Sequence, residues 1–383
     1  LLPLAVQVIW FAIPVGVVPN GLSNGAIAAM SAVALALVYR TNRIVNFAQP
    51  QLGAVGAVVG IQMVGLGGWP LPIGLGLGAA ITALVAFGAN RLVLERFMRA
   101  STMRATVATL ALSQVLAIVA FVVASIVGNP QRSITLPAPG GWTFSGFTLP
   151  INAYHVAGIA VAIAAGAALS AFLRRSPLGI ASRAVADSPD LASIYGFSTR
   201  RVGTVIVLVA AQLSFIAAWL QAGQRGALPA SGPSSAIEFV TPLAAIVLGG
   251  FSNLGRVAVS ALMLGVLEEA IRYSGADAGV YVLVAAVLAQ GVLVIRRRPP
   301  FPRRSAAVPA PTLPSTPSPW ASRIVLLAAA GTSAWIALKA APSTQLTATF
   351  VVLFVLIGLS VVVGGGWSGQ VALAQFGIAA AGG

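Results

Sequence analysis

The stretch that decides the fold is 151–222, in which two long apolar runs flank one polar segment. The first run reads INAYHVAGIAVAIAAGAALSAFL (151–173) and the second reads VGTVIVLVAAQLSFIAAWLQA (202–222). Between them lies RRSPLGIASRAVADSPDLASIYGFSTRR (174–201), which is too polar to enter lipid. A helix needs about 20 mostly apolar residues to cross the hydrocarbon core of a bilayer. The pattern therefore predicts two membrane-spanning helices joined by a loop in water.

The composition extends this prediction to the whole chain. Of the 383 residues, 58% are hydrophobic and only 8% are charged, with a mean hydropathy of +0.95. A soluble domain carries about a quarter of charged residues, so this chain could not cover its surface in water. The sequence has no cysteine and a single histidine, His155. Disulfides, a thiol nucleophile and a Cys- or His-rich metal centre are therefore excluded, and we expect no catalytic residue and no metal site.

Further apolar runs divide the chain into candidate spanning segments. They lie at 1–18, 21–39, 44–65, 71–94, 105–127, 151–173, 202–222, 238–270, 279–295, 321–340 and 347–364. The fold class predicted from them is an all-α polytopic membrane protein. We expect about eight transmembrane helices plus a re-entrant half-helix pair in a first module, followed by a truncated second module.

The basic residues set the expected orientation. There are 22 Lys and Arg against 7 Asp and Glu, which gives a net charge of +15. Such an excess can indicate nucleic-acid binding, but the arginines are grouped in short loops, so we expect no nucleic-acid partner. Cytoplasmic loops of membrane proteins are enriched in Lys and Arg, and we therefore place three clusters in the cytoplasm. The clusters are Arg91, Arg96, Arg99 and Arg104; Arg174, Arg175, Arg183, Arg200 and Arg201; and Arg296, Arg297, Arg298, Arg303 and Arg304.

One run, 238–270, does not fit a single crossing. Both 223–237 and 273–278 must lie outside if 296–304 lies inside, and GGFSNLG (249–255) interrupts the run. Two arms of about 12 residues, about 18 Å each, would reach only part of the way across the membrane. A re-entrant pair of half-helices fits this pattern, and such breaks mark substrate routes in transporters. Two short tilted helices packed through glycine are the alternative.

The residues 296–320 differ in composition from the rest of the chain. They are rich in Arg and Pro and are expected to form a cytoplasmic linker. Hydrophobic helices resume in 321–383. An echo between NFAQPQLGAVGA (46–57) and ALAQFGIAAAGG (372–383) suggests that the second module repeats the first.

The polar segment contains a short capped helix. Ser188 followed by Pro189 is a helix start, Asp190 favours the first turn, and Gly196 is suited to end the helix. Leu191, Ile194 and Tyr195 share one face. An amphipathic helix of this kind can insert into a groove of a partner protein. A helix lying on lipid headgroups is the alternative interpretation.

Several stretches together resemble the permeases of branched-chain amino acid (Liv-type) ABC importers. Four of them match the H-type subunit, and 366–377 is similar to the opening of the M-type subunit. The stretches are NGLSNGAIAAMSAVALALVYR (20–40), RIVNFAQPQL (43–52), LGIASRAVADSPDLASIYG (178–196), VLGGFSNLGRVAVSALMLGVLE (247–268) and GWSGQVALAQFG (366–377). The resemblance implies an H-type permease module at 1–295, the linker at 296–320 and the beginning of an M-type permease module at 321–383.

The resemblance also implies roles for particular residues. Coupling to an ATPase would involve Arg183, Asp190, Leu191, Ala192, Tyr195 and Gly196. The translocation path would include Asn46, Phe47, Ala48, Gln49, Gly249, Gly250, Ser252, Asn253 and Gly255. Asn46 and Gln49 are polar within an apolar run, so they either line water or bond between helices. Gln49 and Gln375 stand where the family usually has histidine.

The function expected is that of a permease subunit of an ABC importer for branched-chain or related amino acids. The chain lacks the GxxxxGK[ST] phosphate loop, so ATP and Mg²⁺ would be bound by partners. Expected partners are two ABC ATPase subunits, a substrate-binding protein, a second permease half and the lipid of the bacterial cytoplasmic membrane. Alternatives are a urea or short-amide permease, an ion-coupled secondary transporter using Glu238 or Glu268, and an assembly or anchor protein that does not transport.

Overall fold

The computed structural model describes 16–97, 102–127, 136–137, 143–144, 151–229, 234–251 and 253–296, with the single positions 320, 323, 327, 331, 334 and 335. The chain divides into two compact units, Leu1–Arg303 and Arg304–Gly383. The boundary between the units falls inside the Arg- and Pro-rich segment. In the second unit the described positions are helical, and the rest of the predicted M-type module, Gln375 included, lies outside the described residues.

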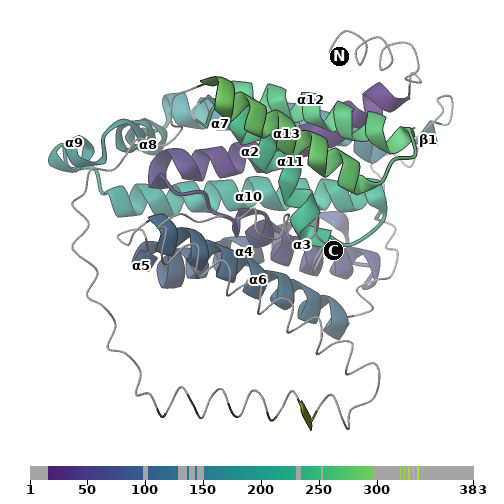
Figure 1. The fold of residues 1–383 in the computed structure, drawn as a ribbon, viewed down its shortest axis with the longest axis horizontal. Helices are drawn as coiled ribbons and strands as arrows, with labels where there is room; N and C mark the ends of the chain where they lie inside the picture. The colour runs from purple at the N-terminus through teal and green to yellow at the C-terminus, as the bar shows by residue number, and fades with distance from the viewer. Residues whose placement is uncertain are drawn as a thin grey trace. The chain divides into compact units, whose positions relative to one another are not determined.

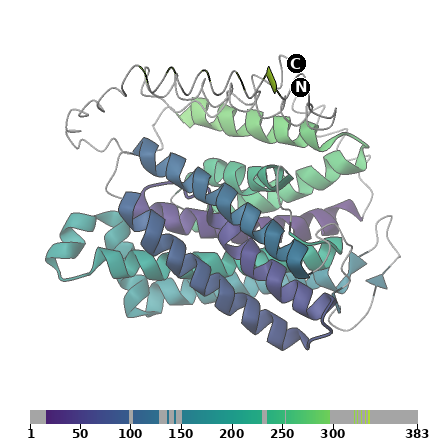
Figure 2. The ribbon, with the colours of Figure 1, turned by 90° about the horizontal axis from the view of Figure 1, so that it is seen from below.

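The first unit is a bundle of helices (Figures 1 and 2). Its helices are α2 (Val17–Asn42), α3 (Gln49–Gly65), α4 (Leu71–Ala89), the π-helix η1 (Asn90–Leu94), α5 (Glu95–Phe97), α6 (Thr102–Val127), α7 (Ala153–Arg175), α8 (Pro177–Asp187), α9 (Pro189–Ile194), α10 (Thr199–Arg225), α11 (Ser234–Gly249), α12 (Leu254–Tyr273) and α13 (Ala278–Arg296). Two short strands, β1 (Thr143–Phe144) and β2 (Ile151–Asn152), pair antiparallel.

Five helices of the described part are long and apolar enough to cross a membrane. They are Val17–Asn42, Leu71–Phe97, Arg104–Ile126, Ala153–Arg175 and Thr199–Arg225. This confirms the all-α polytopic class. The predicted run at 44–65 gives a shorter helix, since α3 begins only at Gln49. The run 1–18 lies largely outside the described residues.

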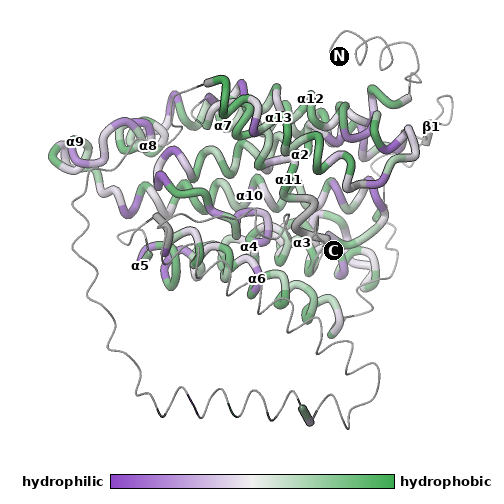
Figure 3. The backbone as a smooth tube through the Cα atoms, in the orientation of Figure 1, coloured by the Kyte–Doolittle hydropathy of each residue, from purple (hydrophilic) through white to green (hydrophobic). Residues whose placement is uncertain are grey.

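Burial separates central helices from peripheral ones. In their most apolar windows, α2 is 72% buried and α10 is 61% buried, whereas the α7 window is only 17% buried. Polar residues gather mainly at the helix ends and connections (Figure 3). Exposed apolar side chains such as Leu84 and Ile163 would be unfavourable in water but match a lipid environment. The unit is therefore built around α2 and α10, with α4, α6 and α7 outside them.

Close backbone contact joins α2 to α12. A Cβ atom at Gly265 would lie 2.3 Å from the Cα atom of Gly25, and one at Gly21 would lie 2.6 Å from the Cα atom of Val266. Helices in membranes associate by this kind of packing through small residues. Because Gly21 meets Val266 and Gly25 meets Leu262, α12 runs antiparallel to α2.

The break predicted in 238–270 is where the sequence places it, but the arms are longer than expected. Helix α11 has 16 residues and α12 has 20 residues, about 24 and 30 Å, so the estimate of about 12 residues per arm is wrong. Sequence reasoning counted only the apolar residues, whereas α11 begins at Ser234 and α12 extends to Tyr273. The Phe251 ring lies 4.8 Å from the Tyr39 ring, so the turn lies near the end of α2. A re-entrant position in the membrane stays a prediction.

We predict that Gly265→Leu lowers the thermal stability of the protein in detergent, because the new side chain would push α12 away from the α2 backbone. Overpacking of this kind costs about 1–3 kcal/mol. The matched control is Gly166→Leu on α7, where no described atom lies within 4 Å of the added Cβ. Equal Tm values for the two variants would contradict the proposed contact.

Candidate functional site

The polar segment between α7 and α10 folds into two short capped helices. Ser176 starts α8, because its hydroxyl accepts a hydrogen bond from the Gly179 amide at 2.9 Å. Ser188 starts α9 in the same way, accepting from the Leu191 amide at 3.4 Å. Gly196, with a φ of +83°, ends the turn after α9, and the Phe197 amide donates to the Ala192 carbonyl at 3.0 Å. The predicted capped helix is confirmed, with both caps in place.

The exposed face of α9 is apolar. The exposed fractions are 57% for Leu191, 77% for Ile194 and 79% for Tyr195, whereas Ala192 is only 3% exposed and packs against the bundle. Arg183 on α8 and Asp190 on α9 are exposed as well. Helices α8 and α9 project beyond the end of the bundle at which α10 begins (Figures 1 and 2). An apolar face in that position suits contact with another protein.

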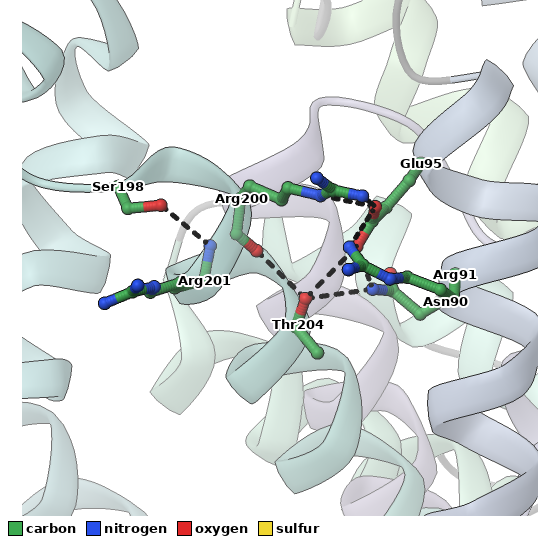
Figure 4. Close-up of polar contacts among 7 residues, drawn as sticks. All are labelled: Asn90, Arg91, Glu95, Ser198, Arg200, Arg201 and Thr204. Carbon is green, nitrogen blue, oxygen red and sulfur yellow. Dashed lines mark hydrogen bonds and ion pairs between the residues drawn. The ribbon is translucent and has the colours of Figure 1, made fainter.

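Polar contacts tie this projecting segment to the spanning helices. The Arg43 guanidinium, at the end of α2, donates to the Ala186 carbonyl of α8. At the start of α10, Arg200 forms an ion pair with Glu95 of α5 at 2.6 Å. Glu95 also pairs with Arg91 at 3.0 Å (Figure 4). The end of α2 is thus linked to the end of α8, and the α4–α5 helix is linked to the start of α10, just after α9.

The Glu95 cluster includes two residues of the π-helix η1, Asn90 and Arg91. Asn90, its first residue, donates to Glu95 at 3.2 Å and to the Thr204 hydroxyl of α10 at 3.1 Å (Figure 4). Short π-helices inside α-helices are frequent at functional sites. Sequence reasoning placed Arg91, Arg200 and Arg201 in cytoplasmic loops but did not find this cluster, because Glu95 lies more than a hundred positions from Arg200.

The predicted path residues Asn46, Phe47, Ala48 and Gln49 lie together between α2 and α3. Asn46 is 2% exposed and Gln49 is 0% exposed. The Asn46 amide donates to the Gln49 side chain at 3.3 Å, and the Gln49 amide donates to the Ser214 hydroxyl of α10 at 3.3 Å. Ala48 is also fully buried. The Gln49 contact matches the alternative in which these amides bond between helices, whereas the Asn46 side chain bonds locally, to Gln49 and to the Ala48 amide.

The residues of the predicted break have different roles. Gly250 and Phe251 have φ values of 85° and 60° and reverse the chain after α11. Asn253 starts α12, accepting from the Arg256 amide at 3.1 Å. Gly249 packs against Val257, where a Cβ would lie 2.6 Å from the backbone, and Gly255 follows the cap. Ser252 lies outside the described residues.

Sequence reasoning missed a cavity of about 420 Å³ between α2, α10, α11, α12 and α13. Its polar lining comes from Asn24, Ser31, Gln221, Gln224, Arg225, Thr241, Glu268, Arg272, Asp277 and Tyr281, and its apolar lining from Ile27, Ala28, Pro242, Ile271 and Ala276. The signal available in the sequence was the set of polar residues in and beside the apolar runs, of which only Glu268 and its expected partner Arg272 were singled out.

A hydrogen-bonded chain crosses one wall of this cavity. Arg272 donates to Glu268 at 3.1 Å, as the spacing of four residues predicts, and Thr241 donates to the other oxygen of Glu268 at 3.2 Å. The Thr241 and Tyr281 hydroxyls are 2.7 Å apart. The neighbouring Glu269 accepts from Asn24 of α2 at 3.0 Å. Glu268 is therefore linked, directly or through Thr241, to three residues from three helices, Arg272 of α12, Thr241 of α11 and Tyr281 of α13.

A second, smaller cavity of about 50 Å³ adjoins the first. Ser31, Gln221 and Pro242 line both cavities. Gln51, which is 6% exposed, and Phe239 line the second one, and the Phe239 ring lies 5.5 Å from the ring of the predicted path residue Phe47. The Gln51 amide oxygen has no hydrogen-bond partner among the described residues. The predicted path residue Phe47 thus contacts the wall of this cavity without lining it.

Comparison with known proteins identifies the family. The family model described as "Branched-chain amino acid transport system / permease component" matches residues 17–295. The high-affinity branched-chain amino acid transport system permease protein BraD of Pseudomonas aeruginosa is 25% identical over 262 residues, which are 65% of this chain and 83% of BraD. Escherichia coli K12 LivH, a permease protein of the same description, is 25% identical over 264 residues, with the same coverage of each chain.

A third similar protein comes from another organism. The probable branched-chain amino acid transport permease protein LivH of Methanocaldococcus jannaschii is 26% identical over 255 residues, 64% of this chain and 78% of the relative. No solved structure matches the chain significantly. The family model extends from the start of α2 to the last turn of α13. The chain therefore belongs to the family of permease components of branched-chain amino acid transport systems.

Proposed function

We propose that this chain is a permease subunit of an ABC importer for branched-chain or related amino acids, driven by separate ATPases. The observation that carries the proposal is the apolar face of α9, formed by Leu191, Ile194 and Tyr195. This face projects from the end of the bundle that bears Arg174, Arg175, Arg183, Arg200 and Arg201. Clusters of arginine mark the cytoplasmic side of membrane proteins, which is the side on which ATP is available.

The contacts behind α9 suit a transmitting role. Arg43 holds the end of α8 to α2, and Arg200 holds the start of α10 to Glu95. A displacement of α9 by an ATPase would therefore be passed to α2 and to the α4–α5 helix at once. Both α2 and α10 line the large cavity, so movement at the cytoplasmic end would reach the site where a substrate can bind.

The proposed assembly contains more than this chain. Two ABC ATPases would bind ATP and Mg²⁺, and a substrate-binding protein would deliver the amino acid on the outer side of the cytoplasmic membrane. A second permease half would complete the pore. Urea or a short amide is the alternative substrate of an importer with the same architecture. The description of the matching family, which names branched-chain amino acids, favours an amino acid.

We predict that Ile194→Asp abolishes ATP-driven uptake of radiolabelled leucine by the complete complex in proteoliposomes. A carboxylate on the α9 face would have to be buried unpaired against the ATPase, which is unfavourable. Since Ile194 is 77% exposed, the permease itself should fold normally. The control is Ile194→Leu, which keeps the apolar face and should retain uptake. Full uptake by the Ile194→Asp complex would contradict the coupling role of α9. Uptake that needs no ATP and follows a proton or sodium gradient would favour a secondary transporter.

The Glu95–Arg200 ion pair gives a second prediction. Glu95→Gln and Arg200→Gln should each lower the Tm, and the double variant should be little worse than either, with a coupling of about 1 kcal/mol. High salt should weaken this coupling, because the Arg200 side chain is 64% exposed. The control is Arg201→Gln, whose side chain points away from Glu95 (Figure 4). Additive effects of the two substitutions on the Tm would show that the ion pair contributes nothing to the stability of the protein.

A further inference from the structure

We propose that the 420 Å³ cavity binds the charged α-ammonium and α-carboxylate groups of a free amino acid, with Glu268 as the main partner of the ammonium group and Arg272 and Arg225 as the partners of the carboxylate. This inference rests on the proposed importer function and assigns the substrate class and the recognising residues of the same pore.

The first support is the balance of charge around the cavity. Its charged lining consists of two carboxylates, Glu268 and Asp277, and two guanidinium groups, Arg225 and Arg272. The net charge of the lining is therefore zero, although both signs are present. Such a lining attracts neither a simple cation nor a simple anion strongly, but it can pair with both ends of a zwitterion.

The second support is the location of these charges. Arg225 ends α10, Arg272 lies in the last turn of α12, and Asp277 lies between α12 and α13, so the charges gather at the end of the bundle opposite the α8–α9 segment, where a substrate from outside would first meet the pore. An importer of a neutral amide or of urea needs hydrogen-bonding groups but no pair of opposite charges. Glu268 lies on the cavity-facing side of α12, and its side chain is 20% exposed, so the carboxylate remains accessible.

The third support is the rigidity of the acidic group. One Glu268 oxygen accepts from Arg272 and the other accepts from Thr241, which is in contact with Tyr281. A carboxylate held from two helices presents its remaining lone pairs in a defined direction. An ammonium group can use those lone pairs without breaking either existing bond.

The apolar part of the lining completes the match. Ile27 and Ala28 of α2 and Ile271 of α12 line the same cavity as the charges. A volume of about 420 Å³ lies in the range of small-molecule sites, which combine apolar walls with a few placed polar groups. A branched aliphatic side chain would contact these walls while its backbone groups meet Glu268 and Arg272.

The test uses the absence of cysteine from the sequence. Ser31→Cys places one thiol on a residue that lines both cavities. The rate of its alkylation is measured in the assembled complex in detergent, with and without leucine. Leucinamide lacks the carboxylate, 4-methylpentanoate lacks the ammonium group, and urea lacks both. The control is Ser170→Cys on the exposed surface of α7, away from both cavities and from α9, where leucine should have no effect on the rate.

We expect leucine to slow alkylation of the thiol in the Ser31→Cys variant at least threefold. Each of the other three compounds should need about a tenfold higher concentration for the same protection. Glu268→Gln and Arg272→Gln should raise the half-protecting concentration of leucine about tenfold. Glu268→Asp should keep part of the protection. The matched control Arg256→Gln, at the opposite end of α12, should leave the protection unchanged.

Two outcomes would overturn the inference. Equal protection by leucine, leucinamide and urea would show that the charges do not select a zwitterion. Absence of protection at leucine concentrations that saturate ATP-driven uptake would show that the substrate does not bind here, while the importer function would stand. Conversely, protection by leucine without any ATP-driven uptake would keep the zwitterion site and reject the ABC importer.

Discussion

The close contact between α2 and α12 is the constraint on which the rest of the first unit depends. At Gly25 and Gly265 the two backbones approach so closely that a single added methyl group would not fit. This contact sets Asn24 against Glu269 and brings Glu268 to the cavity wall opposite α10. In lipid no hydrophobic effect drives helices together, so packing through small residues and polar contacts between helices must position the site.

Much of the fold follows from the sequence, and particular residues show why the rest does not. Apolar runs predict most of the helices, and Ser188, Pro189 and Gly196 predict the caps of α9, because these signals are local. The orientation that the arginine clusters indicate stays a prediction. The helix α3 begins later than its apolar run because a turn precedes it, in which the Asn46 side chain accepts from the Ala48 amide and the Asn46 carbonyl accepts from the Gln49 amide. The arms of the 238–270 segment are longer than estimated, since polar residues such as Ser234 and Arg272 are also helical.

The candidate site is harder to predict than the fold because it depends on contacts between distant residues. Gln49 is polar within an apolar run, but only its bond to Ser214 shows that it joins helices. Glu95 meets Arg200 across 105 positions, and Asn24 meets Glu269 across 245 positions. A single sequence gives the type of each side chain, whereas the cavity arises from five helices whose separations are set by packing.

Pro242 lies inside α11 and lines both cavities together with Ser31 and Gln221. Proline has no amide hydrogen to donate to the carbonyl four positions earlier, so a helix bends more easily at such a residue. The point at which α11 lacks a backbone hydrogen bond therefore lies in the wall that the two cavities share. A bend of α11 at Pro242 would alter both cavities together, without any change in the glycine contact between α2 and α12.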